Sequence, residues 1–304
     1  MKTFEAHRAT GTVYELAESP VWDPVRRTLH WVDIPAGMVL SGRIADGGIV
    51  ETHRILLGES VGAVARAEDG GLLVAAEKGL ATIAASGQVH RGPRMLSAGT
   101  TTRLNDGACD PAGRYLVGSL TPNAAAADQV LLQIEPSGAV TVLRADIGLS
   151  NGIAWSPTGE AVYHVDTTAR RVWTAKYEPS SGRVGQWRIL FTVADGLPDG
   201  MTVDEEGFLW IAVWGRGQVR RYDVAGRIQA TVAVDAPQTS SVAFVGPDLD
   251  TLAITTARSD LSPDDLARYP SSGALFLART DVRGLPEHAW AGDTANPGWA
   301  QVGT

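Results

Sequence analysis

Four side chains with oxygen donors recur at one position of a repeated pattern, each close to an apolar segment. They are Glu18, Asn105, Asn151 and Asp199. Two carboxylates and two amides, with neither Cys nor His among them, suit a hard cation such as Ca²⁺, Mg²⁺ or Mn²⁺. Zn²⁺ and Fe²⁺ stay open, because carboxylates also bind such metals at catalytic sites. The sequence therefore indicates a site for one divalent cation, with Ca²⁺ favoured.

Each donor stands beside residues that are typical of turns. Pro20 follows Glu18 after one residue, and glycine follows each of the other three donors within two residues. Because glycine has no Cβ, we expect it to let the backbone turn sharply at the site. Asn-Gly and Asp-Gly are also ordinary β-turn signals, so any one segment alone is compatible with a simple hairpin. Four of them in one register favour a shared site.

The elements that must position these side chains are short β-strands. The 34 glycines and 16 prolines separate alternating segments rich in Val, Ile, Leu, Trp and Tyr, which is typical of all-β proteins. A strand, a polar turn and a second strand recur at roughly 40 to 48 residues, the length of one propeller blade. The six copies begin at Val21, Val64, Ala108, Ile153, Met201 and Val242.

This repeat predicts an all-β fold, a six-bladed β-propeller with four-stranded antiparallel blades, as a single domain over residues 1–304. We expect residues 12–16 to supply the last strand of the sixth blade and so to close the ring. A β-sandwich with coincidental hairpins is the alternative fold. The best helical candidate is 262–268, where Ser262-Pro263-Asp264 is a start signal.

One position, five residues before the turn of each copy, holds the donors. The six residues at this position are Glu18, Gly62, Asn105, Asn151, Asp199 and Ser240. In a propeller this point lies just before the innermost strand, where the chains converge on the axis. The register therefore predicts that the four donors face one axial channel. Gly62 and Ser240 are poor ligands, so we expect substrate and water on their side of the ring.

Composition excludes several partners. A formal net charge of −8 with interspersed charges argues against nucleic acid, whose phosphates require clustered Lys and Arg. No run approaches the about 18 apolar residues of a membrane span, and residues 1–10 lack a signal-peptide core. The one cysteine, Cys109, agrees with a reducing compartment. We expect a cytoplasmic protein whose oligomeric state is left open.

Five segments carry short motifs that are specific in combination. They are 18–22 (ESPVW), 103–107 (RLNDG), 110–115 (DPAGRY), 150–156 (SNGIAWS) and 198–201 (PDGM). Together they resemble the regucalcin and gluconolactonase family, also called senescence marker proteins, and 209–215 and 237–276 extend the resemblance over essentially the full chain. The resemblance implies a six-bladed propeller that hydrolyses sugar lactones with one divalent metal.

The resemblance also implies a role for individual residues. The family's three metal ligands fall on Glu18, Asn151 and Asp199. Its two substrate contacts fall on Arg103 and Asn105. A family glutamate just after the third blade's second strand has no counterpart in residues 118–123 (GSLTPN). That departure, near Asn123, concerns the choice of substrate more than the reaction.

The implied reaction is hydrolysis of an aldono-lactone, such as glucono-, xylono- or arabinono-lactone, to the sugar acid. The cation would act as a Lewis acid on the carbonyl group, and either Asp199 or a hydroxide on the metal would activate water. Arg103 would bind substrate hydroxyls or the developing negative charge through its planar fork. The alternative readings are a salt bridge inside the channel for Arg103 and a turn former for Asn105.

Two other functions stay open. One is a non-enzymatic calcium- or ligand-binding propeller, and the other is a hydrolase of organophosphates or other esters at the same metal. Arg103 and Asn105 beside the metal register favour catalysis on lactones. A serine hydrolase is disfavoured, because the sequence has no Gly-x-Ser-x-Gly elbow, and its six histidines show no metal-ligand spacing.

Four further features have structural readings. We expect Asp166, at the end of a strand, to tie loops together, with a place in the channel as the alternative. His164 should be packed or hydrogen-bonded, and Cys109 should be a buried thiol. The alanine-rich stretch 123–128 is expected to be one of the loops that set sugar specificity.

Overall fold

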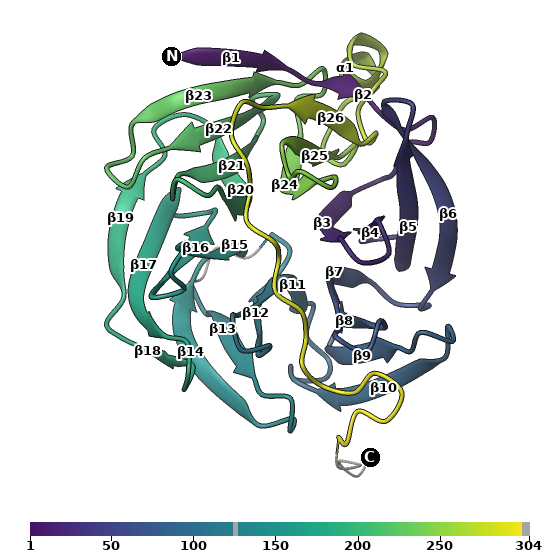
Figure 1. Cartoon of the computed structure of the whole chain (residues 1–304), viewed down its shortest axis with the longest axis vertical. Coiled ribbons are helices and arrows are strands. Elements are labelled where there is room, and N and C mark those ends of the chain that lie inside the picture. The colour runs from purple at the N-terminus through teal and green to yellow at the C-terminus, as the bar shows by residue number, and fades with distance from the viewer. Residues whose placement is uncertain (124–126, 300–304) are drawn as a thin grey trace.

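The computed structural model describes residues 1–123 and 127–299 and contains six β-sheets arranged as blades around a central axis (Figure 1). Each blade has four antiparallel strands, and the fourth and fifth blades each gain one extra strand. This arrangement confirms the predicted six-bladed β-propeller and excludes the β-sandwich. Part of the stretch 123–128, in which a specificity loop was predicted, lies outside the described residues.

Within each blade, the strands follow one another in order from the axis to the rim. Blades one and two contain β3 (Ala17–Asp23), β4 (Thr28–Asp33), β5 (Met38–Ala45) and β6 (Gly48–Leu56), then β7 (Val61–Arg66), β8 (Leu72–Ala76), β9 (Gly79–Ile83) and β10 (Val89–Arg94). Blades three and four contain β11 (Arg103–Cys109), β12 (Tyr115–Leu120), β13 (Gln129–Ile134) and β14 (Val140–Ile147), then β15 (Ser150–Trp155), β16 (Ala161–Asp166), β17 (Arg171–Glu178), β18 (Arg183–Val184) and β19 (Arg188–Thr192). Blades five and six contain β20 (Leu197–Val203), β21 (Leu209–Trp214), β22 (Gln218–Tyr222), β23 (Ile228–Ala233) and β1 (Lys2–Glu5), then β24 (Thr239–Val245), β25 (Thr251–Thr256), β26 (Phe276–Arg279) and β2 (His7–Arg8).

Burial falls from the axis to the rim. Every residue of the inner strands β8 and β15 is buried, whereas most residues of the outermost strand β14 are exposed or half-buried. The inner strands are sandwiched between neighbouring blades on both faces, so apolar side chains on both faces lose their contact with water. Residues from adjacent blades consequently share one hydrophobic cluster, as Leu73 of β8 and Tyr115 of β12 do.

The N-terminal segment closes the ring. β2 pairs antiparallel with β26 in the sixth blade, and β1 pairs parallel with β23 in the fifth, so one segment joins two blades. The prediction that residues 12–16 form the closing strand is wrong, because within that stretch only Leu16 forms a bridge, to Ala257. The chain must pass here from the rim, where β2 ends, to the axis, where β3 begins.

Each innermost strand carries a β-bulge at the same level. The residues skipped in the pairing with the second strand are 19–20, 62, 105–106, 152, 199–200 and 240. A bulge bends a strand and redirects its side chains. The expectation that the donors occupy turns before the innermost strands is therefore wrong, since Asn105, Asn151 and Asp199 lie inside β11, β15 and β20.

Two of the bulge glycines make room for the next blade. A Cβ on Gly62 would lie 2.5 Å from the carbonyl oxygen of Asn105, and one on Gly152 would lie 2.7 Å from that of Asp199. None of the glycines that follow the donors, Gly107, Gly152 and Gly200, has a positive φ, so the expectation of a sharp glycine turn beside each donor is wrong. The residue with left-handed backbone at this level is Ser19, with φ of 49°.

The C-terminal segment crosses the centre of the ring after β26 (Figure 1). It is held at both sides: Glu205 N–H donates to the carbonyl of Arg283, and Trp290 N–H donates to the carbonyl of Arg66. The predicted helix is present as α1 (Pro263–Arg268), capped by Ser262. Among the described residues, no helix has the length and apolar character needed to span a membrane.

We predict that Gly62→Ala lowers the free energy of unfolding by about 1–3 kcal/mol, because the new methyl group would overlap the backbone of β11. Urea denaturation measures this change. The matched control is Gly11→Ala, since a Cβ at Gly11 meets no atom within 4 Å; its effect should stay within about 0.5 kcal/mol. Equal stability of the two variants would show that blades two and three are not in the close contact described.

Candidate active site

Four buried donors gather at the bulges of four inner strands. Glu18, Asn105, Asn151 and Asp199 are each between 5 and 7% exposed. Asn105 Nδ2 donates to Asn151 Oδ1 at 2.8 Å, and the carboxyl groups of Glu18 and Asp199 interact electrostatically. The predicted register therefore brings these residues together. Their functional roles stay predictions at this point.

The two remaining register positions make contacts between blades, and the expectation that substrate and water lie on their side of the ring stays a prediction. The space beside Gly62 is filled by the backbone of Leu104 and Asn105. Ser240 Oγ donates to the carbonyl of Ala17 at 2.6 Å and so joins the sixth blade to the first. Both residues serve contacts between blades at this level.

Arg103 lies beside the four donors. Its Nη1 donates to Asn105 Oδ1 at 2.7 Å and to the carbonyl of Leu104 at 3.0 Å. Burial lowers the pKa of Arg103 to about 10, while the negative charges of Glu18 and Asp199 act in the opposite direction. Within the described part of the chain, its Nε and Nη2 form no hydrogen bond, so one side of the planar fork is free for a ligand.

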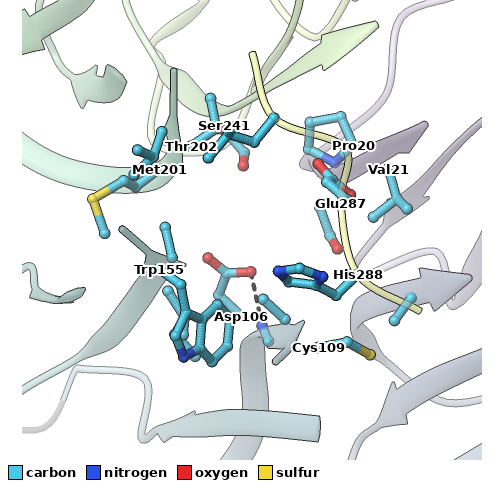
Figure 2. A pocket seen from close by; sticks show the side chains of 18 of the residues that line it. Pro20, Val21, Asp106, Cys109, Trp155, Met201, Thr202, Ser241, Glu287 and His288 are labelled. Atoms are coloured by element: carbon cyan, nitrogen blue, oxygen red, sulfur yellow. Dashed lines mark hydrogen bonds between the residues drawn. The ribbon is translucent and has the colours of Figure 1, made fainter. Parts of the chain in front are cut away.

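Asp106 is a third carboxyl group at the axis, which sequence reasoning missed. The register contains one residue of each copy, whereas the bulge of β11 contains both Asn105 and Asp106. The Asp106 carboxylate accepts a hydrogen bond from the N–H of Gly107 at 2.8 Å, and Figure 2 shows it projecting into an axial cavity. The Asn105-Asp106-Gly107 segment was visible in the sequence, but the bulge was not.

The carboxyl groups crowd one another. Burial, followed by the negative charge of Asp106, raises the pKa of Glu18 to about 8. Burial and the charges of Glu18 and Asp106 raise the pKa of Asp199 well above its ordinary range. Burial likewise raises the pKa of Asp106 to about 6. Arg103 compensates the charges of Glu18 and Asp199, and the presence of a third carboxyl group, that of Asp106, favours binding of a further positive charge.

The donor set is suited to a divalent cation. Asp199 Oδ1 is buried and has no hydrogen-bond partner in the described structure, and such an orphaned acceptor is costly unless a ligand satisfies it. Among the described residues, no three or more His, Cys, Asp or Glu side chains are arranged to hold a metal ion. A cation at this point therefore needs an amide oxygen, which Asn151 provides beside Glu18 and Asp199.

Below the donors, the axis widens into a cavity of about 380 Å³. Inner strands of all six blades form its wall, and residues 285–288 of the C-terminal segment border it on the far side. Figure 2 shows Glu287 and His288 of this segment facing the same cavity as Asp106 and Trp155. Asp106 thus stands between the donors and the cavity, and its charge acts on both Glu18 and Glu287.

The residues given structural readings behave as predicted. Asp166 accepts hydrogen bonds from the N–H groups of Gly148 and Leu149, and so ties loops together. His164 is fully buried, with Nε2 at 2.8 Å from the hydroxyl of Ser150. Cys109 is a buried free thiol.

The sequence matches a known family over most of its length. The family model described as the SMP-30/gluconolactonase/LRE-like region matches residues 16–258. The chain belongs to this family. The match covers all six bulges, and so every predicted metal ligand and substrate contact of this SMP-30/gluconolactonase member lies within the region that the family shares.

Relatives of this SMP-30/gluconolactonase member have nearly the same length. Pentonolactonase of Haloferax volcanii is 33% identical over 92% of this chain and 96% of its own. 6-Deoxy-6-sulfogluconolactonase of Pseudomonas putida is 32% identical over 91% of this chain and 95% of its own. The crystal structure of regucalcin from Agrobacterium tumefaciens, described as a calcium-binding protein, has a TM-score of 0.89 and 30% identity, covering 95% of this chain and 99% of that one. The family resemblance seen in the sequence is confirmed.

We predict that the metal-free protein loses stability as the pH rises from about 5 to 8. The pKa of Glu18 rises from 4.5 to about 8 on folding, so the folded state binds more protons in this window. The free energy of unfolding should therefore fall by up to about 1.4 kcal/mol per pH unit through this group. Glu18→Gln should flatten that slope, as measured by denaturation in a chelating buffer.

The control for this measurement is Glu5→Gln, which removes an exposed carboxylate from β1. Its slope should equal that of the wild type. With a saturating divalent cation, the wild type should instead be more stable than Glu18→Gln, because the wild type alone keeps both of the predicted carboxylate ligands. An unchanged pH slope in Glu18→Gln would contradict the crowding of charge at the axis.

Proposed function

We propose that this protein hydrolyses a sugar-derived lactone to the corresponding sugar acid, using one divalent cation bound by Glu18, Asn151 and Asp199. The chain is an enzyme of the lactonase class, as family membership and relatives named lactonases indicate. The observation that carries the proposal is the buried, unpartnered Oδ1 of Asp199 beside Glu18, Asn151 and the free side of Arg103. A bound cation would supply Lewis acidity toward the lactone carbonyl.

Arg103 and Asn105 are proposed to bind the substrate. The unused nitrogens of Arg103 would donate to substrate hydroxyls or to the oxygen that gains negative charge when water adds to the carbonyl. Asn105 is held between Arg103 and Asn151, so its place relative to both is constrained. The two residues would orient the lactone ring before the reaction, which lowers the entropic cost of reaching the transition state.

Asp199 is proposed to accept the proton of the attacking water. Water adds to the lactone carbonyl, the ring C–O bond breaks, and the proton passes to the departing alkoxide, so that a hydroxy acid is formed. Oδ1 of Asp199 has no hydrogen-bond partner in the described chain, and one oxygen of this carboxylate would bind the cation while the other accepts the proton. An ester as reactive as a lactone needs no covalent intermediate with the enzyme.

Calcium is the proposed cation, and aldono-lactones are the proposed substrates. Oxygen-only ligation favours a hard cation, and the A. tumefaciens regucalcin of similar structure is described as calcium-binding. Pentonolactonase and 6-deoxy-6-sulfogluconolactonase, two relatives, are named for sugar lactones of different size and charge. Glucono-, xylono- and arabinono-lactone are therefore the first substrates to test.

We predict that Asp199→Ala lowers metal-dependent lactone hydrolysis by about 100-fold or more, because it removes both a metal ligand and the proposed proton acceptor. Far-UV circular dichroism should not change. Asp248→Ala, which removes an exposed carboxylate beyond β24, is the control and should keep full activity. Full activity in Asp199→Ala would overturn the assignment.

A substrate panel separates this function from the alternatives. We expect turnover of at least one of D-glucono-, D-xylono- and L-arabinono-lactone with Ca²⁺ present, and loss of turnover with a chelator. A pH-stat assay measures the acid released. Absence of lactone turnover with metal bound would favour a binding protein, whereas turnover restricted to organophosphates or other esters would favour a different hydrolase.

A further inference from the structure

A chain of hydrogen bonds runs through the candidate active site across three blades. Arg103 Nη1 donates to Asn105 Oδ1 at 2.7 Å, and Asn105 Nδ2 donates to Asn151 Oδ1 at 2.8 Å. Asn151 Nδ2 donates to Thr167 Oγ1 at 2.9 Å, and Thr167 Oγ1 donates to the carbonyl of Pro198 at 2.7 Å. Pro198 directly precedes Asp199, so the chain connects two proposed metal ligands.

The two ends of this chain determine its direction. A guanidinium group only donates hydrogen bonds, so Asn105 must turn its oxygen toward Arg103 and its NH₂ toward Asn151. A carbonyl group only accepts, so Thr167 must give its hydroxyl proton to Pro198 and can then only accept from Asn151. Asn151 therefore presents NH₂ to Thr167 and its amide oxygen to the opposite side.

The orientation of the Asn151 amide matters because only its oxygen can bind a cation. With NH₂ on Thr167, Oδ1 receives one hydrogen bond from Asn105 and keeps a second lone pair. In the flipped amide, two NH₂ groups of Asn105 and Asn151 would face each other. Thr167 could then donate its single hydroxyl proton either to Asn151 Oδ1 or to the carbonyl of Pro198, and the other buried acceptor would be left unpaired.

Thr167 is well placed to hold this orientation. Its side chain is buried, and its backbone is anchored separately, since its N–H donates to the carbonyl of Leu149 and its carbonyl accepts from the N–H of Arg170. Removal of the hydroxyl group alone should therefore leave the loop in place. Thr167 follows Asp166, and nothing in the sequence separates it from an ordinary loop threonine.

We propose that Thr167 is a positioning residue, which holds the amide oxygen of Asn151 toward the cation and joins it to the strand that carries Asp199. The inference rests on the proposed function, because it assumes a cation bound by Glu18, Asn151 and Asp199. Thr167 itself touches neither cation nor substrate. It acts through Asn151 and through the carbonyl of Pro198.

The test compares Thr167→Val, which keeps the shape and removes the hydroxyl, with Thr167→Ser, which keeps the hydroxyl. Calorimetric titration of the chelator-treated protein with Ca²⁺ should show affinity about 10- to 100-fold weaker in Thr167→Val, the range for residues that orient metal ligands. Thr167→Ser should remain within about threefold of the wild type. Lactone turnover in Thr167→Val should need correspondingly more Ca²⁺ and should recover when the site is saturated.

Thr256→Val is the matched control. Thr256 is also buried and also both donates to a carbonyl, that of Ala274, and accepts from an N–H, that of Gly273, but it lies in the sixth blade away from Asn151. Loss of this hydroxyl should lower thermal stability without changing Ca²⁺ affinity. The comparison separates orientation of the ligand from general loss of buried hydrogen bonds.

Three results would overturn the inference. Wild-type Ca²⁺ affinity in a folded Thr167→Val variant would show that the hydroxyl does not orient Asn151. Equal weakening in Thr167→Val and Thr167→Ser would show that keeping the hydroxyl does not preserve Ca²⁺ affinity, so that the loss does not come from the orientation of Asn151 by the hydroxyl. Failure of the wild type to bind Ca²⁺, Mn²⁺ or Zn²⁺ would overturn the proposed metal-dependent function as well, and so is distinguishable from the first two results.

Discussion

The site depends on the convergence of six innermost strands at one axis, each with a β-bulge at the same level. Regular strands would send alternate side chains between the blades, where apolar packing dominates. The bulges break this alternation and direct polar side chains to the axis. Gly62 and Gly152 let neighbouring bulges approach each other, and Ser19 takes left-handed backbone beside Glu18. The same bulges therefore determine both how closely the blades approach one another and where the donors lie.

Convergence has an electrostatic cost, and the same cost creates the capacity to bind a cation. Glu18, Asp106 and Asp199 are brought close together at the axis, where Arg103 is a compensating charge for Glu18 and Asp199. Their raised pKa values show that the folded protein disfavours ionisation of all three. A divalent cation would remove much of this penalty. A protein that needed the axis only for stability would be better served by apolar side chains there.

Hydrogen bonds supply the direction that charge alone lacks. The donor-only Arg103 and the acceptor-only carbonyl of Pro198 orient two amides between them. Asn105 and Asn151 thereby acquire different surroundings, since Asn105 Oδ1 accepts from Arg103 and Asn151 Oδ1 accepts from Asn105. The chain crosses blades three, four and five, so the packing of the blades and the orientation of a proposed metal ligand are coupled.

The periodicity of the sequence was enough to predict the architecture of this protein. The spacing of apolar segments and turns predicted the six blades and the register of Glu18, Asn105, Asn151 and Asp199, because these follow from a repeat that is local in the sequence. Short motifs in five segments, rather than the repeat, indicated the family. The prediction that residues 12–16 close the ring was wrong. The distance from the rim to the axis determines which N-terminal residues pair with β26. A local sequence pattern does not contain that distance.

Only the tertiary structure decided the details of the site. The bulges placed the donors inside strands rather than in turns, and they brought Asp106 to the axis as well as Asn105. The glycines proved to serve contacts between blades, and Thr167 acquired its importance from Asn151 and Pro198, which lie in two other segments of the chain. A repeat determines which residues are equivalent, whereas hydrogen-bond direction and close approach depend on neighbours that are distant in sequence.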